Sequence, residues 1–166
     1  MTDRVLPEMQ VPVDQFEIAR YDLVLWAQLQ SSFALCLYDE VQEGGALLHM
    51  QIGRPGHVAD PELTDNTLST NLLLLDSCIA ELRHSDPRAR HWQAKFVAHS
   101  DERRGGRELA LGVQSFIEAY LEDVGIGLIS AAVHSDESLR LSFRPSMGQL
   151  RCEPVTATTQ RLRQIT

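Results

Sequence analysis

Short apolar runs alternate with polar connections along the first third of the chain. Three of them have the length and composition of β-strands: 22–29, 33–38 and 46–52. The polar stretch 39–45 ends in two glycines and predicts a hairpin connection between the second and third runs. Residues 1 to about 20 are polar and interrupted by prolines, so we expect an N-terminal arm with room for a short edge strand.

Two later stretches have the period of an amphipathic helix. In the first, apolar residues recur at helical spacing up to Arg83, and Asp65 or Asn66 is a candidate N-cap. Cys78 lies on that apolar stripe, so we interpret it as a core residue. The second helix is expected from about residue 107 to Val124, with Gly125 as its stop.

Further strands are expected at 92–98, 127–133 and 139–143, with a short one at 149–153. The resulting order predicts an α+β fold, a layered, β-sandwich-like mixed sheet with two main helices packed on it. We expect an N-terminal arm (1–20), one domain (21–153) and a mobile C-terminal tail (154–166). A nucleotide-binding fold is not expected, because no glycine-rich loop joins a strand to a helix.

Net charge, cysteine content and the length of the apolar runs limit the classes of protein to which the chain can belong. The chain has 166 residues and a formal net charge of -8, which argues against a general nucleic-acid surface. The basic cluster at 103–107 is best interpreted as a solvated loop. Three cysteines without a CxxC pair, no signal-peptide pattern and no membrane-length apolar run indicate a cytoplasmic protein without membrane insertion.

Candidate chemistry begins at "LQSSFALCLYD", residues 29–39. Two hydroxyls, Ser31 and Ser32, stand at the head of an apolar strand, and "GGALLHM" follows with a single histidine, His49. A hydroxyl and an imidazole on neighbouring strands are the parts of a nucleophile and its base. The other histidines at 57, 84, 91 and 134 match no common zinc spacing, and neither a metal nor another cofactor is expected.

Five segments in order carry a resemblance to a known family: "SSFALCLYD", "GGALLH", "DNTLSTNLLLL", "QAKFVA" and "LGVQSFIEAYLEDVGI". Across 21–153 the chain resembles the bacterial chemoreceptor glutamine deamidases, the CheD family. The resemblance implies layered β-sheets with flanking helices. It also implies hydrolysis of glutamine side-chain amides on chemoreceptors by a cysteine and a histidine that a threonine orients, and a chemotaxis phosphatase, CheC, as a partner.

Alignment on "CLYD" places Ser32 where the resemblance implies the catalytic cysteine. His49 falls on the family's histidine with the family's separation. The orienting threonine falls on Trp26, and Gln30 replaces the glycine of Gly-Ser-Cys. The resemblance thus implies Ser32 and His49 as the catalytic positions, with Ser31, Gln30 and Trp26 as binding residues.

A second departure lies in the segment after "QAKF". Residues 97–100 replace a Phe-Gly-Gly-Ala pattern, and His99 among them is a further candidate binding residue. Gln114 and Ser115 replace an Arg-Asn pair. So many changes in one pocket argue against a single engineered substitution at Ser32.

The substitutions weaken the expected chemistry. A thiol is partly ionised near neutral pH, whereas a serine hydroxyl needs an oriented histidine and an oxyanion hole. Cys36 cannot substitute, since four residues along one strand is roughly 13 Å. The leading interpretation is a chemosensory pseudoenzyme that binds a chemoreceptor, phosphatase or adaptor and has lost most deamidase activity. An active deamidase using a Ser32–His49 dyad is the alternative, and recruitment outside chemotaxis, with Trp26 filling the pocket, is a third.

Overall fold

The computed structural model describes residues 5–52, 61–100, 105–135 and 137–155. In this part of the chain, nine strands and two long helices form. Their bounds are β1 Glu8–Gln10, β2 Gln15–Ala19, β3 Val24–Leu29, β4 Ser32–Asp39, β5 Gly45–Gln51, α1 Pro61–Ser85, β6 Trp92–His99, α2 Gly106–Val124, β7 Gly127–His134, β8 Leu139–Arg144 and β9 Gln149–Pro154. A short 3-10 turn, Pro145–Met147, joins β8 to β9.

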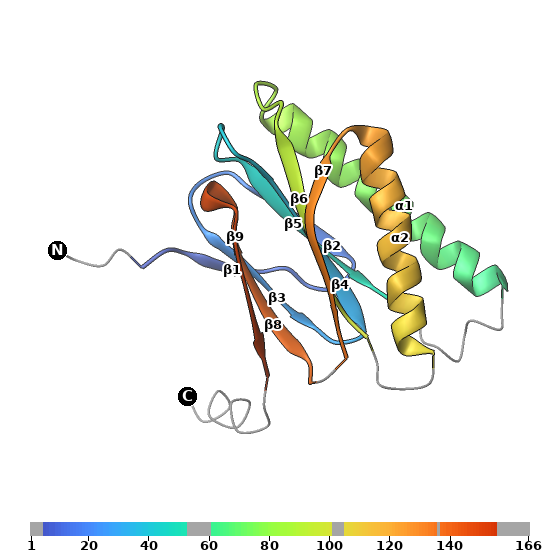
Figure 1. The fold of residues 1–166 in the computed structure, drawn as a ribbon. Coiled ribbons are helices and arrows are strands. Elements are labelled where there is room, and N and C mark those ends of the chain that lie inside the picture. The colour runs from blue at the N-terminus through green and yellow to red at the C-terminus, as the bar shows by residue number, and fades with distance from the viewer. Residues whose placement is uncertain (1–4, 53–60, 101–104, 136, 156–166) are drawn as a thin grey trace.

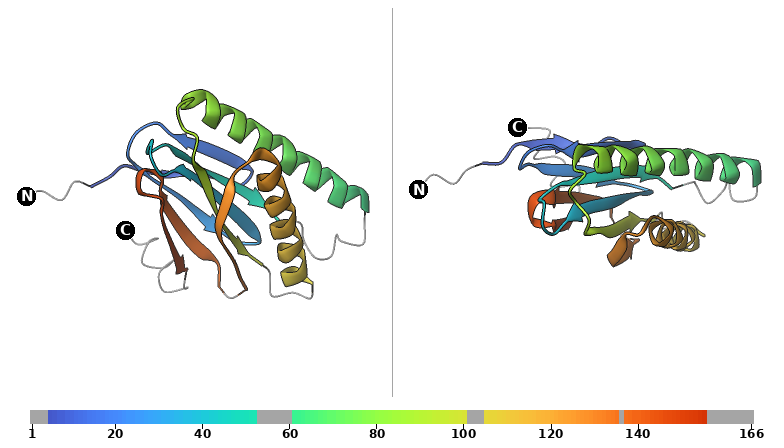
Figure 2. Two further views of the ribbon diagram at one scale, coloured as in Figure 1. Left: turned by 45° about the horizontal axis from the view of Figure 1, so that its top comes forward. Right: turned by 90° about the horizontal axis from the view of Figure 1, so that it is seen from above.

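The strands form two sheets that pack face to face. One has the order β1-β3-β8-β9 and the other β2-β5-β4-β6-β7. Each sheet is mixed, because β1 pairs with β3 and β6 pairs with β7 in parallel, while the other pairs are antiparallel. Figures 1 and 2 show both helices on the same side of the five-stranded sheet, so the layers run helices, five strands, four strands. The predicted fold class is confirmed.

Strand β4 is the centre of this arrangement, and all eight of its residues are buried. Phe33, Leu35 and Leu37 pack in the cluster shared with the helices. The alternate residues Ala34 and Cys36 pack in the cluster between the two sheets. The alternation follows from the two-residue period of a strand, and burial of both faces explains the unbroken apolar run.

The helices cover the outer face of the five-stranded sheet. Helix α2 has the predicted extent and ends at Gly125 in the left-handed conformation (φ 77°), where the Ile126 N–H donates to the Leu121 carbonyl. Helix α1 begins at Pro61, so Asp65 and Asn66 lie inside it and the predicted cap is wrong. Proline suits the first turn of a helix, because the amide hydrogen that it lacks has no intrahelical partner there.

The N-terminal segment takes part in both sheets. Strand β1 lies beside β3, and β2 lies beside β5, each at an edge. At the other end of the chain, β9 continues to Pro154 and Val155 is buried. The domain boundaries remain predictions, and the tail from residue 156 lies outside the described residues.

The β4–β5 hairpin is held by a buried carboxylate. Asp39 is 2% exposed and accepts backbone N–H bonds from Val41, Gln42 and His91. Burial raises the pKa of Asp39, but these three donors outweigh it and hold the pKa below its usual range. The sequence predicted a polar hairpin connection here, without a buried carboxylate. The carboxylate is buried because it also ties the start of β6 to the hairpin.

Gly45 marks the closest backbone approach at this hairpin. A Cβ atom there would overlap the Leu37 carbonyl oxygen and lie 2.6 Å from the Pro145 Cβ. Gly45→Ala is expected to lower the free energy of unfolding by about 1–3 kcal/mol, because neither neighbour can move without shifting backbone. Chemical denaturation measures the change.

Gly112→Ala is the matched control. Gly112 is exposed in α2, and a Cβ there meets nothing within 4 Å. This change is expected to raise the free energy of unfolding by about 0.5–1 kcal/mol through helix propensity. Equal effects of the two substitutions would contradict the close packing assigned to Gly45.

Candidate active site

Three polar residues from neighbouring strands meet at one end of the five-stranded sheet. Ser32 begins β4, opposite His99 of β6. On the other side, His49 of β5 pairs with Ala34 and therefore points to the same face as Ser32. Ser32, His49 and His99 are 2%, 4% and 6% exposed. The structure thus brings together the two predicted catalytic residues and one predicted binding residue.

The hydrogen bonds of His49 fix its tautomer. Its Nδ1 lies 3.0 Å from the Val11 carbonyl oxygen, and its Nε2 lies 2.9 Å from the Ser32 Oγ. A carbonyl accepts only, so Nδ1 must carry the hydrogen. In the neutral ring Nε2 is then bare, and the Ser32 hydroxyl donates to it. This is the arrangement that a general base requires before it takes a proton from a nucleophile.

Val11 is the part of the site that sequence reasoning missed. It lies between β1 and β2, is 1% exposed, and its N–H donates to the Trp26 carbonyl over 2.8 Å. Three residues further on, the Asp14 N–H donates to the His49 carbonyl over 2.7 Å. The N-terminal segment therefore holds His49 at its ring and at its backbone. A backbone carbonyl leaves no signal in the residue type, so no sequence motif could have indicated it.

The turn before Ser32 has a fixed pattern of amide bonds. The Gln30 N–H donates to the Ser32 Oγ over 3.1 Å, and the Ser31 N–H donates to the His99 Nδ1 over 3.0 Å. Ser31 has a left-handed backbone (φ 49°), which is uncommon for a residue other than glycine. Gln30 and Ser31 thus enter the site through their backbone amides.

Trp26 lies apart from this group. Its neighbours Leu25 and Ala27 face the core between the sheets, so the Trp26 side chain points to the outer face of the four-stranded sheet. There the Arg140 guanidinium carbon stands 4.2 Å from the centre of its ring. Only the backbone carbonyl of Trp26 connects to the site, through Val11.

The electrostatics of His49 favour its neutral form. Burial lowers the pKa of the imidazole, while the bond to the Val11 carbonyl and the nearby Asp14 charge act in the opposite direction. The bond at Nδ1 is to a neutral carbonyl, which stabilises an imidazolium less than an ionised carboxylate does. His49 can orient and accept a proton, but the charged state that follows is poorly supported.

Across the residues that the structure describes, the core cysteines and the remaining possible metal ligands show no arrangement for chemistry. Cys36 and Cys78 are buried, as expected for core thiols, and burial raises the pKa of each. Within the described part of the chain, no group of three histidine, cysteine or acidic side chains is arranged to hold a metal ion. Nor is any helix there long and apolar enough to cross a membrane.

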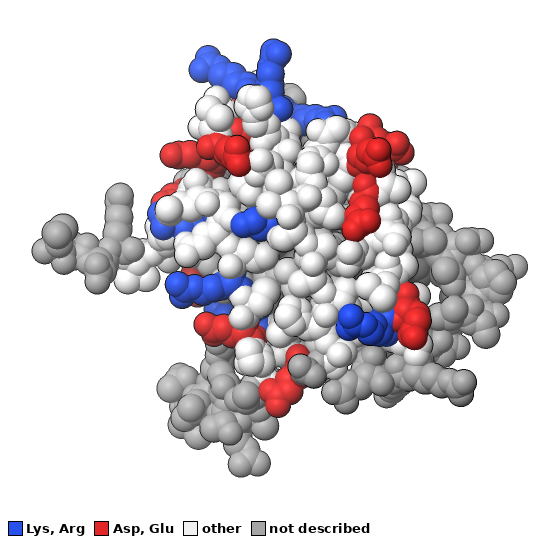
Figure 3. Space-filling view, viewed as in Figure 1, with Lys and Arg blue, Asp and Glu red and all other residues white. Residues whose placement is uncertain are grey.

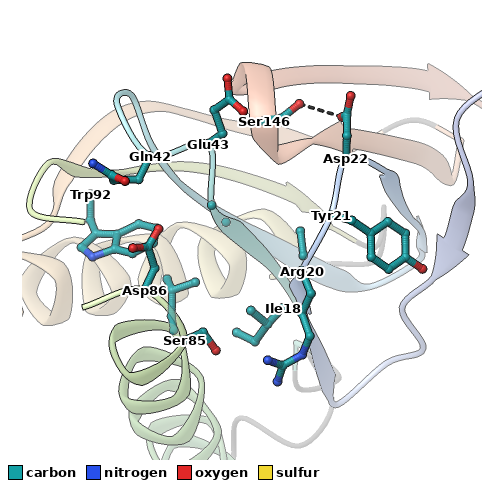
Figure 4. A pocket seen from close by; sticks show the side chains of 14 residues that line it. Ile18, Arg20, Tyr21, Asp22, Gln42, Glu43, Ser85, Asp86, Trp92 and Ser146 are labelled. Atoms are coloured by element: carbon teal, nitrogen blue, oxygen red, sulfur yellow. Dashed lines mark hydrogen bonds between the residues drawn. The ribbon is translucent and has the colours of Figure 1, made fainter. Parts of the chain in front are cut away.

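A hollow of about 430 Å³ lies at the opposite end of β4, about 23 Å from Ser32 along the strand. Figure 4 shows its wall, where Ser146 donates to the Asp22 carboxylate over 2.7 Å and Trp92 forms one side. Among the described residues, Trp92 Nε1 is a buried donor with no acceptor. The hollow contains none of the predicted site residues.

Comparison with known proteins gives one informative match. The chain is 25% identical over 136 residues to a protein of Zymomonas mobilis described as a probable chemoreceptor glutamine deamidase CheD. The match covers 81% of this chain and 72% of that protein. No family model matches the sequence. The similarity supports a distant relationship to a deamidase of chemotaxis and says nothing about the serine at position 32.

The neutral state of His49 predicts a pH dependence of stability. The unfolded chain takes up a proton near pH 6.5, while the folded protein resists it down to the lowered pKa. The stability that neutral His49 contributes is therefore complete above this window and is lost as the pH falls through it. Because His49→Gln removes this titration, the difference in unfolding free energy between natural protein and variant should shrink from pH 7.5 to 5. A difference that is constant or grows toward pH 5 would contradict a buried neutral imidazole.

Proposed function

We propose that this chain is a chemosensory protein related to the receptor glutamine deamidases, which receives a glutamine side chain at Ser32 and His49 and hydrolyses it weakly or not at all. The observation that carries the proposal is the 2.9 Å contact between the Ser32 Oγ and the His49 Nε2. These residues occupy the positions that the family resemblance implies for the nucleophile and its base. The protein would act by binding a chemoreceptor or a signalling partner.

The site retains the groups that recognise a carboxamide. A glutamine amide has a carbonyl that accepts and an NH₂ that donates. The Ser32 hydroxyl donates its hydrogen to His49 and accepts from the Gln30 N–H, and its second lone pair remains for the amide NH₂. Recognition therefore needs no thiol.

Turnover is expected to be poor for two reasons. A serine hydroxyl is far less acidic than a thiol, so the base must remove its proton during attack. The base, His49, is then left as an imidazolium whose burial disfavours the charge and whose Nδ1 bond is to a neutral carbonyl. Both effects raise the barrier without removing the binding groups.

An active serine amidase is the second candidate. The tautomer that Val11 imposes on His49 favours it, because a bare Nε2 facing the Ser32 hydroxyl is the starting state of general-base catalysis. The two candidates differ in the rate of hydrolysis and share the same contact residues.

The surface beside the site suits a protein partner. Strand β7 ends at His134, next to His99 of β6. Figure 3, in the view of Figure 1, shows an uncharged area over β7 with charged side chains around it. The residues 129–132 of β7 are exposed. A chemoreceptor segment reaching Ser32 from this side would meet little opposing charge, and the protein would meet it in the cytoplasm.

Mass spectrometry of a chemoreceptor cytoplasmic fragment from the same organism tests the proposal. The fragment is incubated with the natural protein, with Ser32→Cys, and with a variant carrying both Ser32→Cys and His49→Gln. We expect glutamine-to-glutamate conversion with Ser32→Cys and little or none with the natural protein. The double variant should be slower than Ser32→Cys by at least about 100-fold, because it lacks the proton-transfer partner.

Two outcomes would change the conclusion. Conversion by the natural protein at a rate similar to Ser32→Cys would establish the serine amidase and exclude the weak enzyme. Absence of conversion by every variant, together with no binding of the fragment in calorimetry, would contradict a glutamine site on a receptor.

A further inference from the structure

We propose that His99 is a positioning residue for Ser32. Its role depends on one acceptor atom, the side-chain Nδ1, which binds the backbone of the turn before Ser32. The His99 Nδ1 takes the Ser31 N–H over 3.0 Å, and this bond fixes the turn that directs the Ser32 hydroxyl toward His49. The inference rests on the proposed function only in treating position 32 as the one that contacts substrate.

The turn needs such an anchor because its backbone is strained. Ser31 has φ 49°, a left-handed conformation that is unfavourable for a residue with a side chain. It is held at both of its peptide groups, since its N–H donates to His99 and its carbonyl accepts the Ile52 N–H over 3.0 Å. If one anchor is lost, the turn can relax, and Ser32 is the next residue along the chain.

The same turn connects directly to the hydroxyl. The Gln30 N–H donates to the Ser32 Oγ over 3.1 Å, so the hydroxyl accepts from Gln30 and donates to His49. The 30–31 peptide group carries the Ser31 N–H, and the neighbouring 29–30 group carries the Gln30 N–H. Relaxation of the turn after loss of the Ser31 bond would therefore shift the Gln30 donor as well and change the hydroxyl direction. His99 thereby acts on the Ser32–His49 geometry through the backbone of the turn.

The bond also specifies the chemical state of His99. An N–H can donate only to a nitrogen without a hydrogen, so Nδ1 is bare and neutral His99 carries its hydrogen on Nε2. Asparagine places an amide oxygen, also an acceptor, at a similar distance from the backbone. Alanine offers none and leaves a Ser31 amide without this partner. Both variants lose the imidazole, but only asparagine keeps an acceptor atom. Comparing them therefore shows whether the site needs the acceptor or the ring.

The test uses a thiol at position 32 as a reporter of geometry. The background is Ser32→Cys with Cys152→Ser, because Cys152 is exposed. Position 32 is itself 2% exposed, so alkylation is followed on the peptide that carries it, separately from the peptides of the buried Cys36 and Cys78. Iodoacetamide alkylates the thiolate at position 32 and releases iodide, and mass spectrometry follows the rate from pH 5 to 9. A thiol paired with His49 reacts at a lower pH than a free thiol does.

Three proteins are compared: the background, the background with His99→Asn, and the background with His99→Ala. We expect His99→Ala to lose the low-pH reactivity and to react about tenfold or more slowly at pH 7, as misaligned groups do. His99→Asn should keep the pH profile of the background. The readout needs no receptor, so failure of the receptor assay leaves it unaffected.

Either of two results would overturn the proposal. One is a His99→Ala profile that matches the background, and the other is a His99→Asn profile as altered as that of His99→Ala. Should His99→Ala fail to fold, the natural protein provides a second measurement. Nitrogen NMR must then show a bare Nδ1 on His99 and slow hydrogen exchange of the Ser31 amide, and a protonated Nδ1 in the neutral ring would contradict the inference.

Discussion

Burial of β4 on both faces is the constraint on which the rest of the structure depends. One face packs against the helices through Phe33 and its alternate neighbours, and the other packs against the four-stranded sheet. Because both edges of β4 also pair, with β5 and β6, its first residue has little freedom. The register of the sheet therefore places Ser32 between His49 and His99. The geometry of the site thus depends on the packing of the core around β4.

The N-terminal segment supplies the group that orients His49. It crosses from one sheet to the other between β1 and β2, and on the way the Val11 carbonyl sets the tautomer of His49. This produces an ordered hydroxyl–imidazole pair whose orienting group is neutral. Under the proposed function, an ordered pair without a stabilised imidazolium would bind a carboxamide more readily than it would hydrolyse one.

Much of the fold could be predicted from local pattern. The apolar runs at 33–38 and 46–52 gave β4 and β5 because their side chains are buried, and α2 followed from its single apolar face and Gly125. Strands β1 and β2 were not clear, because their edge pairing depends on partners distant in sequence. The start of α1 was misplaced, because polar residues suited to a cap also occur inside helices.

The sequence could indicate the site residues that act through their side chains but not the contributions made by backbone groups. The serine and the histidines at 32, 49 and 99 could be proposed from residue type, order and family resemblance. Val11 could not, because any residue supplies a carbonyl. Trp26 was predicted by alignment alone, and the alternation of β3 turns its ring to the outer face. The roles of Gln30 and Ser31 in the structure belong to their amides, which their side chains do not reveal.

The tautomer of His49 in the natural protein is the most direct test of this account. Two-dimensional nitrogen–proton NMR of the histidine rings distinguishes a protonated from a bare ring nitrogen at neutral pH. The Val11–His49–Ser32 arrangement predicts a hydrogen on Nδ1 and a bare Nε2. A hydrogen on Nε2, or rapid averaging between the two tautomers, would contradict it, because Ser32 would then have no oriented base.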